Sequence, residues 1–259
     1  MHRFFIPPEK IVGQTIILDD PRELHHLRDV RRLGKGDEVV CFDGQGREYA
    51  GAIIASRAGQ VVIQIARTRE PVKRGVDIWL AQSLLKGERF EWVAQKATEL
   101  GVARLTPLLT RHTVVKVGAA QGPRKQARWQ RIATESAKQC GRATVPQIDP
   151  PCRFDEAIPQ LAACGLVVMP TLAVTTMPLR EVLEEGCGRR TACIGVLIGP
   201  EGDFSREEVA LAEAHGARPV SLGEFTLRSE TAAIAKVAIL QYELRVSSDE
   251  LTRKERWQK

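Results

Sequence analysis

The sequence IGVLIGPEGDFS (residues 194–205) runs from an apolar strand through a glycine turn into the start of a helix. LGEFTLRSETAA (residues 222–233) repeats this arrangement a short distance later. In open parallel sheets, ligands bind beyond the carboxyl ends of the strands, and glycine lets the backbone approach a ligand closely. Two such turns can therefore line one pocket. Taken alone, Gly199–Gly202 is equally consistent with an ordinary strand-to-helix turn.

The glycine loops that usually hold nucleotide phosphates are missing. No G-x-G-x-x-G follows the first strand of the alternating region, and no G-x-x-x-x-G-K-[ST] occurs. These two motifs hold the phosphates of dinucleotides and of ATP. Binding of NAD or ATP in those modes is disfavoured, and a different nucleoside-bearing ligand stays open.

The second turn leads into a helix whose first residues are polar. Ser229 can cap this helix, and Glu230 suits its positive end. Capping alone explains both residues. In a functional interpretation, Arg228 points into a cleft, where its planar guanidinium could hold a phosphate or a carboxylate.

The composition is that of a folded protein with a basic surplus. The chain has 259 residues, of which 43% are hydrophobic, and a formal net charge of +6. This length supports one large domain or two smaller ones. The positive charge permits a polyanionic partner such as nucleic acid, although solubility explains it as well.

The cysteines and the apolar segments indicate the cellular compartment in which the protein is expected. Cys41, Cys140, Cys152, Cys164, Cys187 and Cys193 form no C-x-x-C and have no histidine at a ligand spacing, so we expect no metal site. Scattered cysteines suit a reducing compartment, where they act as small apolar residues. With no signal peptide and no apolar run of about 18 residues, the sequence predicts a cytoplasmic protein without membrane association.

The N-terminal part is predicted to form a small β-barrel of about 70 residues. Strands are expected at residues 15–18, 38–42, 48–55 and 60–66, with a short helix at 25–32. Asp43-Gly44 between two apolar runs indicates a hairpin.

From residue 75 onward, strands and helices alternate. Strands are expected at 77–84, 104–108, 166–169, 194–198 and 219–222, and helices at 88–100, 124–139, 179–185, 205–216 and 230–246. This alternation predicts an α/β domain with a mostly parallel sheet. The predicted organisation is a barrel at 1–72, an α/β domain at 73–247 and a polar tail at 248–259.

Two clusters of basic residues are candidates for binding the phosphates of a nucleic acid. One lies in the barrel, at Arg22, Arg28, Arg31, Arg32 and Lys35. The other lies on the helix from 124, where Arg124, Arg128, Arg131 and Lys138 share roughly one face. We add Arg3 and Lys86 to the candidates. A solvated helix face is the more common explanation of such a stripe.

The histidines give no sign of nucleophilic catalysis. His25, His26, His112 and His215 lie in ordered regions, and no G-x-S-x-G motif accompanies them. A hydrolase is therefore disfavoured.

Several blocks along the chain resemble the ribosomal RNA small subunit methyltransferase E family of the SPOUT superfamily. They are Met1–Phe5, residues 25–38, Gln95–Val102, Glu135–Arg142 and the two glycine turns. Their shared order makes the resemblance more specific than any single block. The resemblance implies a PUA-like barrel that holds RNA and a SPOUT domain with a deep trefoil knot near residues 195–235.

The resemblance also implies the activity and the site. The family methylates N3 of a specific uridine in 16S ribosomal RNA of the small subunit, with S-adenosyl-L-methionine as cofactor, and is homodimeric. For this chain it implies a cofactor site made by Pro170, Thr171, Ile198, Gly199, Pro200, Glu201, Gly202, Leu222, Gly223, Thr226 and Leu227. Arg228 and Glu230 would serve the uracil, Arg228 by stabilising its anion and Glu230 by orienting or accepting a proton.

The chain departs from the family pattern at two places. Asp203 stands where glycine is more common, and Thr110–Thr113 stands where Glu-Arg-Ser is common. The substrate is either naked 16S RNA or the assembled small subunit. Two alternatives stay open: a SPOUT methyltransferase with another RNA target, and a non-catalytic RNA-binding protein.

Overall fold

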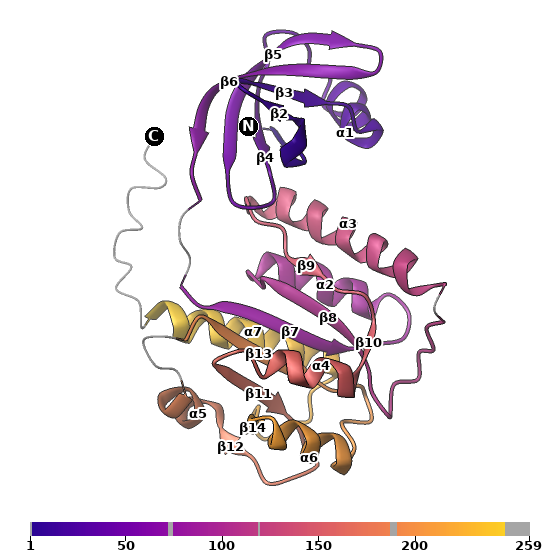
Figure 1. The fold of residues 1–259 in the computed structure, drawn as a ribbon, viewed down its shortest axis with the longest axis vertical. Helices are drawn as coiled ribbons and strands as arrows, with labels where there is room; N and C mark the ends of the chain where they lie inside the picture. The colour runs from indigo at the N-terminus through magenta and orange to yellow at the C-terminus, as the bar shows by residue number, and fades with distance from the viewer. Residues whose placement is uncertain (1, 72–74, 119, 187–190, 247–259) are drawn as a thin grey trace. The chain divides into compact units, whose positions relative to one another are not determined.

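The chain divides into two compact units, which are described separately. A computed structural model describes residues 2–71, 75–118, 120–186 and 191–246 (Figure 1). The first unit comprises Met1–Lys73 and Thr134–Val145, and the second comprises Arg74–Ala133 and Pro146–Lys259. The predicted domain boundary at 72/73 and the predicted tail at 248–259 lie outside the described residues.

The first unit is built on a six-stranded sheet with the order β1-β4-β5-β6-β3-β2. The strands are β1 (His2–Phe5), β2 (Ile11–Val12), β3 (Thr15–Leu18), β4 (Glu38–Phe42), β5 (Glu48–Arg57) and β6 (Gln60–Arg69). Short helical turns are η1 (Pro8–Lys10), α1 (Pro21–His25) and η2 (His26–Val30). One apolar cluster takes residues from β1, β3, β4, β5 and β6, so the sheet encloses a single core.

The helical segment of this unit begins earlier than predicted. Asp20 is its N-cap, and the Asp20 carboxylate accepts hydrogen bonds from the backbone N–H groups of Arg22 and Glu23. Pro21 occupies the first helical position, where its missing N–H group costs nothing. The prediction of a helix at 25–32 missed this start.

The prediction that Lys138 lies on an exposed basic face is wrong. Lys138 is buried and its Nζ lies 2.8 Å from Oε1 of Glu23, also buried, within the first unit. Burial raises the pKa of the Glu23 carboxyl, and Lys138 opposes that rise. Removal of either partner would leave the other as an unpaired buried charge, which is strongly destabilising. The ion pair between Lys138 and Glu23 therefore holds the end of α3 (Gly122–Cys140) against α1.

The second unit is an α/β fold in which all strand pairs are parallel, as predicted. Its sheet has the order β10-β8-β7-β13-β11-β14-β12, with β9 beside β8. The strands are β7 (Asp77–Ser83), β8 (Arg104–Leu109), β9 (Gln147–Ile148), β10 (Cys152–Arg153), β11 (Leu166–Pro170), β12 (Met177–Pro178), β13 (Cys193–Ile198) and β14 (Ala217–Ser221). The helices besides α3 are α2 (Arg89–Glu99), α4 (Phe154–Leu161), α5 (Leu179–Gly186), α6 (Arg206–Ala214) and α7 (Ser229–Val246).

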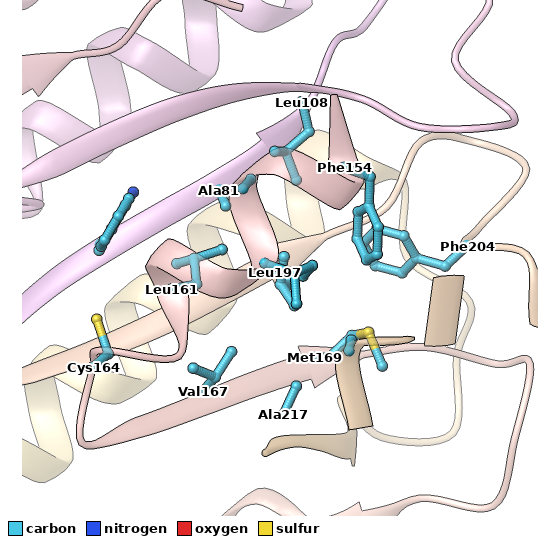
Figure 2. Packing of buried hydrophobic residues seen from close by; sticks show 14 of the residues in the cluster. Ala81, Leu108, Phe154, Leu161, Cys164, Val167, Met169, Leu197, Phe204 and Ala217 are labelled. Atoms are coloured by element: carbon cyan, nitrogen blue, oxygen red, sulfur yellow. The ribbon is translucent and has the colours of Figure 1, made fainter. Parts of the chain in front are cut away.

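Helices cover both faces of this sheet (Figure 1). On one face, α4 and α6 pack over an apolar cluster that includes Ala81, Val167 and Leu197 (Figure 2). On the other face, α7 contacts β7, β13 and α2. Strands buried on both faces are apolar throughout, which explains the continuous apolar runs of β11 and β13. None of the described helices has the length and apolar character needed to cross a bilayer.

Helix α4 has no counterpart among the helices that the sequence predicts. It contains Pro159, and its N-cap is Arg153, whose side chain makes no capping hydrogen bond. Proline inside a helical pattern normally signals the end of a helix. Here the apolar face of α4, including Phe154, Ala157 and Ile158, packs into the core. Tertiary packing therefore outweighs the local signal.

The prediction that the cysteines act as isolated thiols is wrong for two of them. Cys164, which follows α4, and Cys193, at the start of β13, form a disulfide with their Cα atoms 4.9 Å apart. The disulfide links the two chain segments at the end of the sheet where β11 and β13 begin. Cys41, Cys140 and Cys152 are free, and Cys187 lies outside the described residues.

Lys236 is an unusual member of α7, because it is fully buried. Its Nζ has no hydrogen-bonding partner among the described residues. Burial lowers the pKa of Lys236 to about 7. Between that value and the ordinary lysine value, the unfolded chain holds a proton that the folded chain lacks. Stability contributed at this position therefore rises with pH across that window.

We expect Lys236→Met to stabilise the protein, and to do so more at pH 6.5 than at pH 9.5. The gain should reach several kcal/mol at the lower pH, because one pKa unit corresponds to about 1.4 kcal/mol and methionine fills a similar volume. Urea unfolding at both pH values measures it. Lys96→Met, on the surface of α2, is the matched control. Equal gains at the two pH values would contradict the prediction.

Candidate functional site

A pocket lies at the edge of the second sheet where four neighbouring parallel strands end. In the order β7-β13-β11-β14, the carboxyl ends are Ser83, Ile198, Pro170 and Ser221. Parallel pairing brings these ends to the same edge, where the following loops approach one another. The location is that expected for ligand binding in an open α/β sheet.

Three loops and the start of α7 line this pocket. The lining residues are Pro170, Thr171, Leu172 and Thr176 after β11, Ile198, Gly199, Pro200, Glu201 and Asp203 after β13, Val220, Ser221, Leu222, Gly223, Phe225, Thr226 and Leu227 around and after the end of β14, and Ser229 and Ala232 of α7. All predicted cofactor-contacting residues except Gly202 are among them. They come together although the first and last are more than 50 positions apart in the sequence.

Asp203 links two walls of the pocket. Its Oδ2 accepts hydrogen bonds from the Thr171 hydroxyl at 2.8 Å and from the Leu172 backbone N–H at 2.7 Å. Its Oδ1 accepts from the Phe204 backbone N–H at 2.8 Å. The residue has a φ of 55°, a left-handed conformation that aspartate tolerates better than most residues. The carboxylate thus fixes the loop after β13 to the loop after β11.

The residues around Asp203 anchor the loop further. Phe204 is buried in the core, where its ring lies against Phe154 with centroids 5.3 Å apart (Figure 2). On the outer side, Nδ1 of His112 lies 2.9 Å from the Gly202 carbonyl oxygen and 3.0 Å from that of Asp203. Because a carbonyl only accepts, Nδ1 carries the proton. This contact explains why Gly202 faces His112 and does not line the pocket.

Ser229 connects the start of α7 to the same loop. The Ser229 hydroxyl donates a hydrogen bond to the Gly199 carbonyl oxygen and accepts one from Nε2 of Gln82 at 2.9 Å. All three residues are buried. The Ser229 side chain therefore joins β7, the loop after β13 and α7, in addition to any capping role.

The two predicted catalytic residues have different environments. Arg228 is exposed, and its side chain forms no hydrogen bond or ion pair with the described part of the chain. The Glu230 side chain is only 13% exposed. The two residues lie two positions apart in the sequence, but the structure does not pair their side chains.

The cation that lies near Glu230 is Arg89, which sequence reasoning missed. Nη1 of Arg89 lies 2.7 Å from Oε1 of Glu201 and 4.0 Å from Oε2 of Glu230. Arg89 begins α2, more than 100 residues before both carboxylates, so no local pattern connects them. Only the pairing of β7 with β13 brings the start of α2 to the pocket edge.

The RNA-binding candidates divide by what their side chains contact. Arg3 pairs with Glu48 at 2.6 Å and donates to the Arg142 carbonyl, both within the first unit. Arg28 donates to Ser56 and to backbone carbonyls of the turn between β5 and β6. These two arginines stabilise the first unit.

The remaining candidates are more accessible. Arg22, Arg31, Arg32, Lys86, Arg124, Arg128 and Arg131 are all exposed. Arg31 donates to Nε2 of His26, and Arg128 pairs with Glu91. Exposure leaves these side chains available to phosphates, and their role in RNA binding stays a prediction. In the described ranges, no group of His, Cys, Asp and Glu could hold a metal ion.

Comparison with known families agrees with this architecture. The family model described as RNA methyltransferase domain matches residues 72–241, and that described as RNA methyltransferase PUA domain matches residues 18–66. The first match contains the whole pocket, and the second lies within the first unit.

Relatives resemble the chain over almost its full length. A ribosomal RNA small subunit methyltransferase E from Synechocystis sp. is 33% identical, over 92% of this chain and 76% of the relative. A protein of the same name from Neisseria gonorrhoeae, solved bound to S-adenosyl methionine, is 27% identical with a TM-score of 0.80, over 94% of this chain and 98% of its own. A Legionella pneumophila protein solved with the bound cofactor SAM is 34% identical with a TM-score of 0.82, over 93% and 97%.

The Asp203 contacts predict a measurable rigidity of the pocket loops. Asp203→Ala should speed amide hydrogen exchange at Leu172 and Phe204 by roughly 10-fold or more, because hydrogen bonds to a charged group contribute about 1.5–3 kcal/mol. Asp203→Asn keeps an acceptor oxygen and should show a smaller effect. Exchange followed by mass spectrometry measures both.

Glu213→Ala, on the exposed side of α6, is the control and should leave these amides unchanged. Unaltered exchange in the Asp203→Ala variant would show that other contacts hold the loops.

Proposed function

The chain belongs to the RNA methyltransferase family that includes ribosomal RNA small subunit methyltransferase E, and on this basis we propose that it transfers a methyl group from S-adenosylmethionine to N3 of a specific uridine in 16S ribosomal RNA. The observation that carries the proposal is the pocket of three loops at the carboxyl edge of the parallel sheet. The solved relatives named above, which contain this cofactor, match the chain over nearly its whole length.

The residues of the pocket fit such a cofactor. Ile198, Leu222 and Leu227 offer apolar surface for a flat purine ring, and the loops present backbone N–H and C=O groups. The lining lacks a phosphate-binding glycine motif, and this cofactor carries no phosphate. When bound, S-adenosylmethionine supplies an electrophilic methyl group on a sulfonium. Glycine at 199 lets the loop pack closely, because a Cβ there would lie 3.2 Å from Oδ1 of Asp203.

N3 lies on the pairing edge of uracil, so the target base has to be unpaired or turned out of its stack. The proton on N3 must leave before or while the nitrogen attacks the methyl group. Glu230, at the edge of the pocket, is proposed to orient the base or accept this proton. Arg228 is proposed to act on the substrate side, and its exposure suits contact with RNA. Holding the base in line with the methyl group supplies much of the rate.

Substrate recognition is proposed to involve both units. The PUA match and the exposed arginines of the first unit support contact with RNA there. The proposed substrate is 16S ribosomal RNA or the assembled small subunit, which places the protein in the cytoplasm. The deep trefoil knot near residues 195–235 also belongs to the proposal, and is supported by the resemblance to solved relatives.

The proposed activity predicts a defined product. Small subunits isolated from a strain lacking the gene, incubated with this protein and S-adenosylmethionine, should gain one methyl group at N3 of a single uridine, as mapped by mass spectrometry. Glu230→Gln should slow single-turnover transfer by about 100-fold or more, as expected for loss of a general base. Arg228→Ala should also slow it.

The outcomes separate the alternatives. Methylation at a different nucleotide would favour another RNA target. If calorimetry detected no binding of S-adenosylmethionine to the intact protein, the non-catalytic RNA-binding alternative would be favoured. Wild-type rates in both variants would remove Arg228 and Glu230 from the chemistry.

A homodimer is also part of the proposal. Large apolar side chains are exposed at Leu172, Phe225, Ile239 and Tyr242. Leu172 and Phe225 line the cofactor pocket, and Ile239 lines a neighbouring apolar groove that shares Ser221–Gly223 with it. Exposed apolar groups that gather around one site mark an interaction surface. A second copy of the chain is proposed to cover this surface.

The dimer predicts a mass twice that of the 28.7 kDa chain in light scattering. Ile239→Arg should shift the protein toward the monomer, because it places a charge in an apolar interface. Val12→Arg, at an exposed apolar position of the first unit, should leave the dimer intact. A monomeric wild-type protein at micromolar concentration would contradict the proposal.

A further inference from the structure

The carboxylate of Glu230 has an oxygen that nothing in the described chain satisfies. Oε2 is buried and accepts no hydrogen bond from the described residues. A buried acceptor without a donor normally costs about 1–3 kcal/mol. Ser229, the preceding residue, lines the cofactor pocket. Nη1 of Arg89, 4.0 Å from this oxygen, also pairs with Glu201 of the pocket lining. A ligand that brings an N–H donor to that edge of the pocket would remove the cost.

Arg89 supplies a fixed positive charge beside this oxygen. Nη1 of Arg89 lies 4.0 Å from Oε2 of Glu230 and 2.7 Å from Oε1 of Glu201. Its Nε donates to the Lys86 carbonyl at 3.3 Å, which holds the base of the guanidinium plane. Glu201 itself lines the pocket. One guanidinium thus lies between a pocket-lining carboxylate and a carboxylate that lacks a hydrogen-bond donor.

This pair of groups matches the pairing edge of uracil. That edge presents an N–H donor at N3 with a carbonyl acceptor on each side. A carboxylate can accept from N3–H while a neighbouring guanidinium donates to one of the carbonyls. Loss of the N3 proton spreads negative charge onto both carbonyl oxygens, so the same guanidinium would stabilise the charge as it develops.

We propose that Arg89 and Glu230 together bind the pairing edge of the target uracil, with Arg89 as the catalytic cation. This inference rests on the proposed function. The N3 proton passes to the Glu230 carboxylate, and N3 forms a bond to the methyl carbon. The bond from that carbon to sulfur breaks, and its electron pair stays on the sulfur. The proton on Glu230 then passes to solvent. Arg228, being exposed, is left to contact the RNA backbone.

Glu201 has a defined place in this arrangement. Before the base arrives, it holds Arg89 at the edge of the pocket by the 2.7 Å ion pair. A uracil carbonyl competes with Glu201 for the guanidinium, whose several N–H donors can serve both. Glu201→Gln would weaken the ion pair and leave Arg89 in place, so it should alter the apparent affinity for RNA more than the rate of transfer.

The experiment compares full-length Arg89→Ala and Arg89→Lys with the wild type, on small subunits from a strain lacking the gene. Arg89→Ala should reduce the single-turnover rate by about 100-fold or more, in the range seen when an oxyanion-stabilising donor is lost. Its dissociation constant for S-adenosylmethionine, measured by calorimetry, should stay within about threefold of the wild-type value. A threefold change corresponds to well under about 1.4 kcal/mol of binding free energy, which would be a tenfold change. Arg206→Ala, at an exposed arginine that begins α6, is the matched control.

Two further readouts separate catalysis from structure. Millimolar guanidinium ion should partly restore the Arg89→Ala rate and leave Arg206→Ala unaffected. The rate of Arg89→Ala should also keep rising with pH over a range in which the wild-type rate is level, because deprotonation of N3 has lost its stabilising cation.

The outcomes are distinguishable. A wild-type protein that methylates no uridine at N3 would overturn the proposed function and this inference together. A wild-type protein that does so, with Arg89→Ala equally fast, would overturn the inference alone. Loss of S-adenosylmethionine binding in Arg89→Ala, in parallel with the rate, would place Arg89 on the cofactor side and overturn its contact with uracil.

Discussion

The hydrogen bonds of the buried Ser229 hydroxyl are the constraint on which the pocket depends. They tie the first residue of α7 to the Gly199 carbonyl and to Gln82 of β7. This junction fixes the start of α7 against the loop after β13 and thereby helps to position Glu230. The Asp203 carboxylate extends the same network to the loop after β11. Two small polar groups therefore position walls that come from three separate strands.

The sequence predicted the parts of the fold that have local causes. The capping box formed by Ser205 and Glu208 marks the start of α6, and Asp43-Gly44 predicts the hairpin between β4 and β5. The sequence also predicted the glycine turns at the ends of β13 and β14, since glycine is a local signal of a turn. In the same way, alternating strands and helices were enough to predict the parallel sheet of the second unit. The caps and turns are local signals, because each depends on a few neighbouring residues, and the alternation is the succession of such segments along the chain.

What the sequence could not predict depends on contacts between distant residues. Arg89 is an ordinary helix-start arginine until β7 pairs with β13 and brings Glu201 within 2.7 Å. Lys138 has the helical spacing of an exposed stripe, and only the fold of the first unit places Glu23 beside it. The disulfide of Cys164 and Cys193 likewise needs the start of β11 beside the start of β13. A local proline signal in α4 was misleading for the same reason, because packing decided the outcome.

Two unsatisfied polar groups on α7 show how position decides what a buried charge can do. Lys236 lies well inside the helix with an amino group that has no hydrogen-bonding partner among the described residues, and burial lowers its pKa. Glu230 lies in the first turn, where the unpaired N–H groups of the helix favour negative charge. Its unsatisfied oxygen is therefore less costly, and it adjoins a pocket and a guanidinium. The same kind of defect is a loss of stability in the middle of the helix and an available acceptor at its N-terminus.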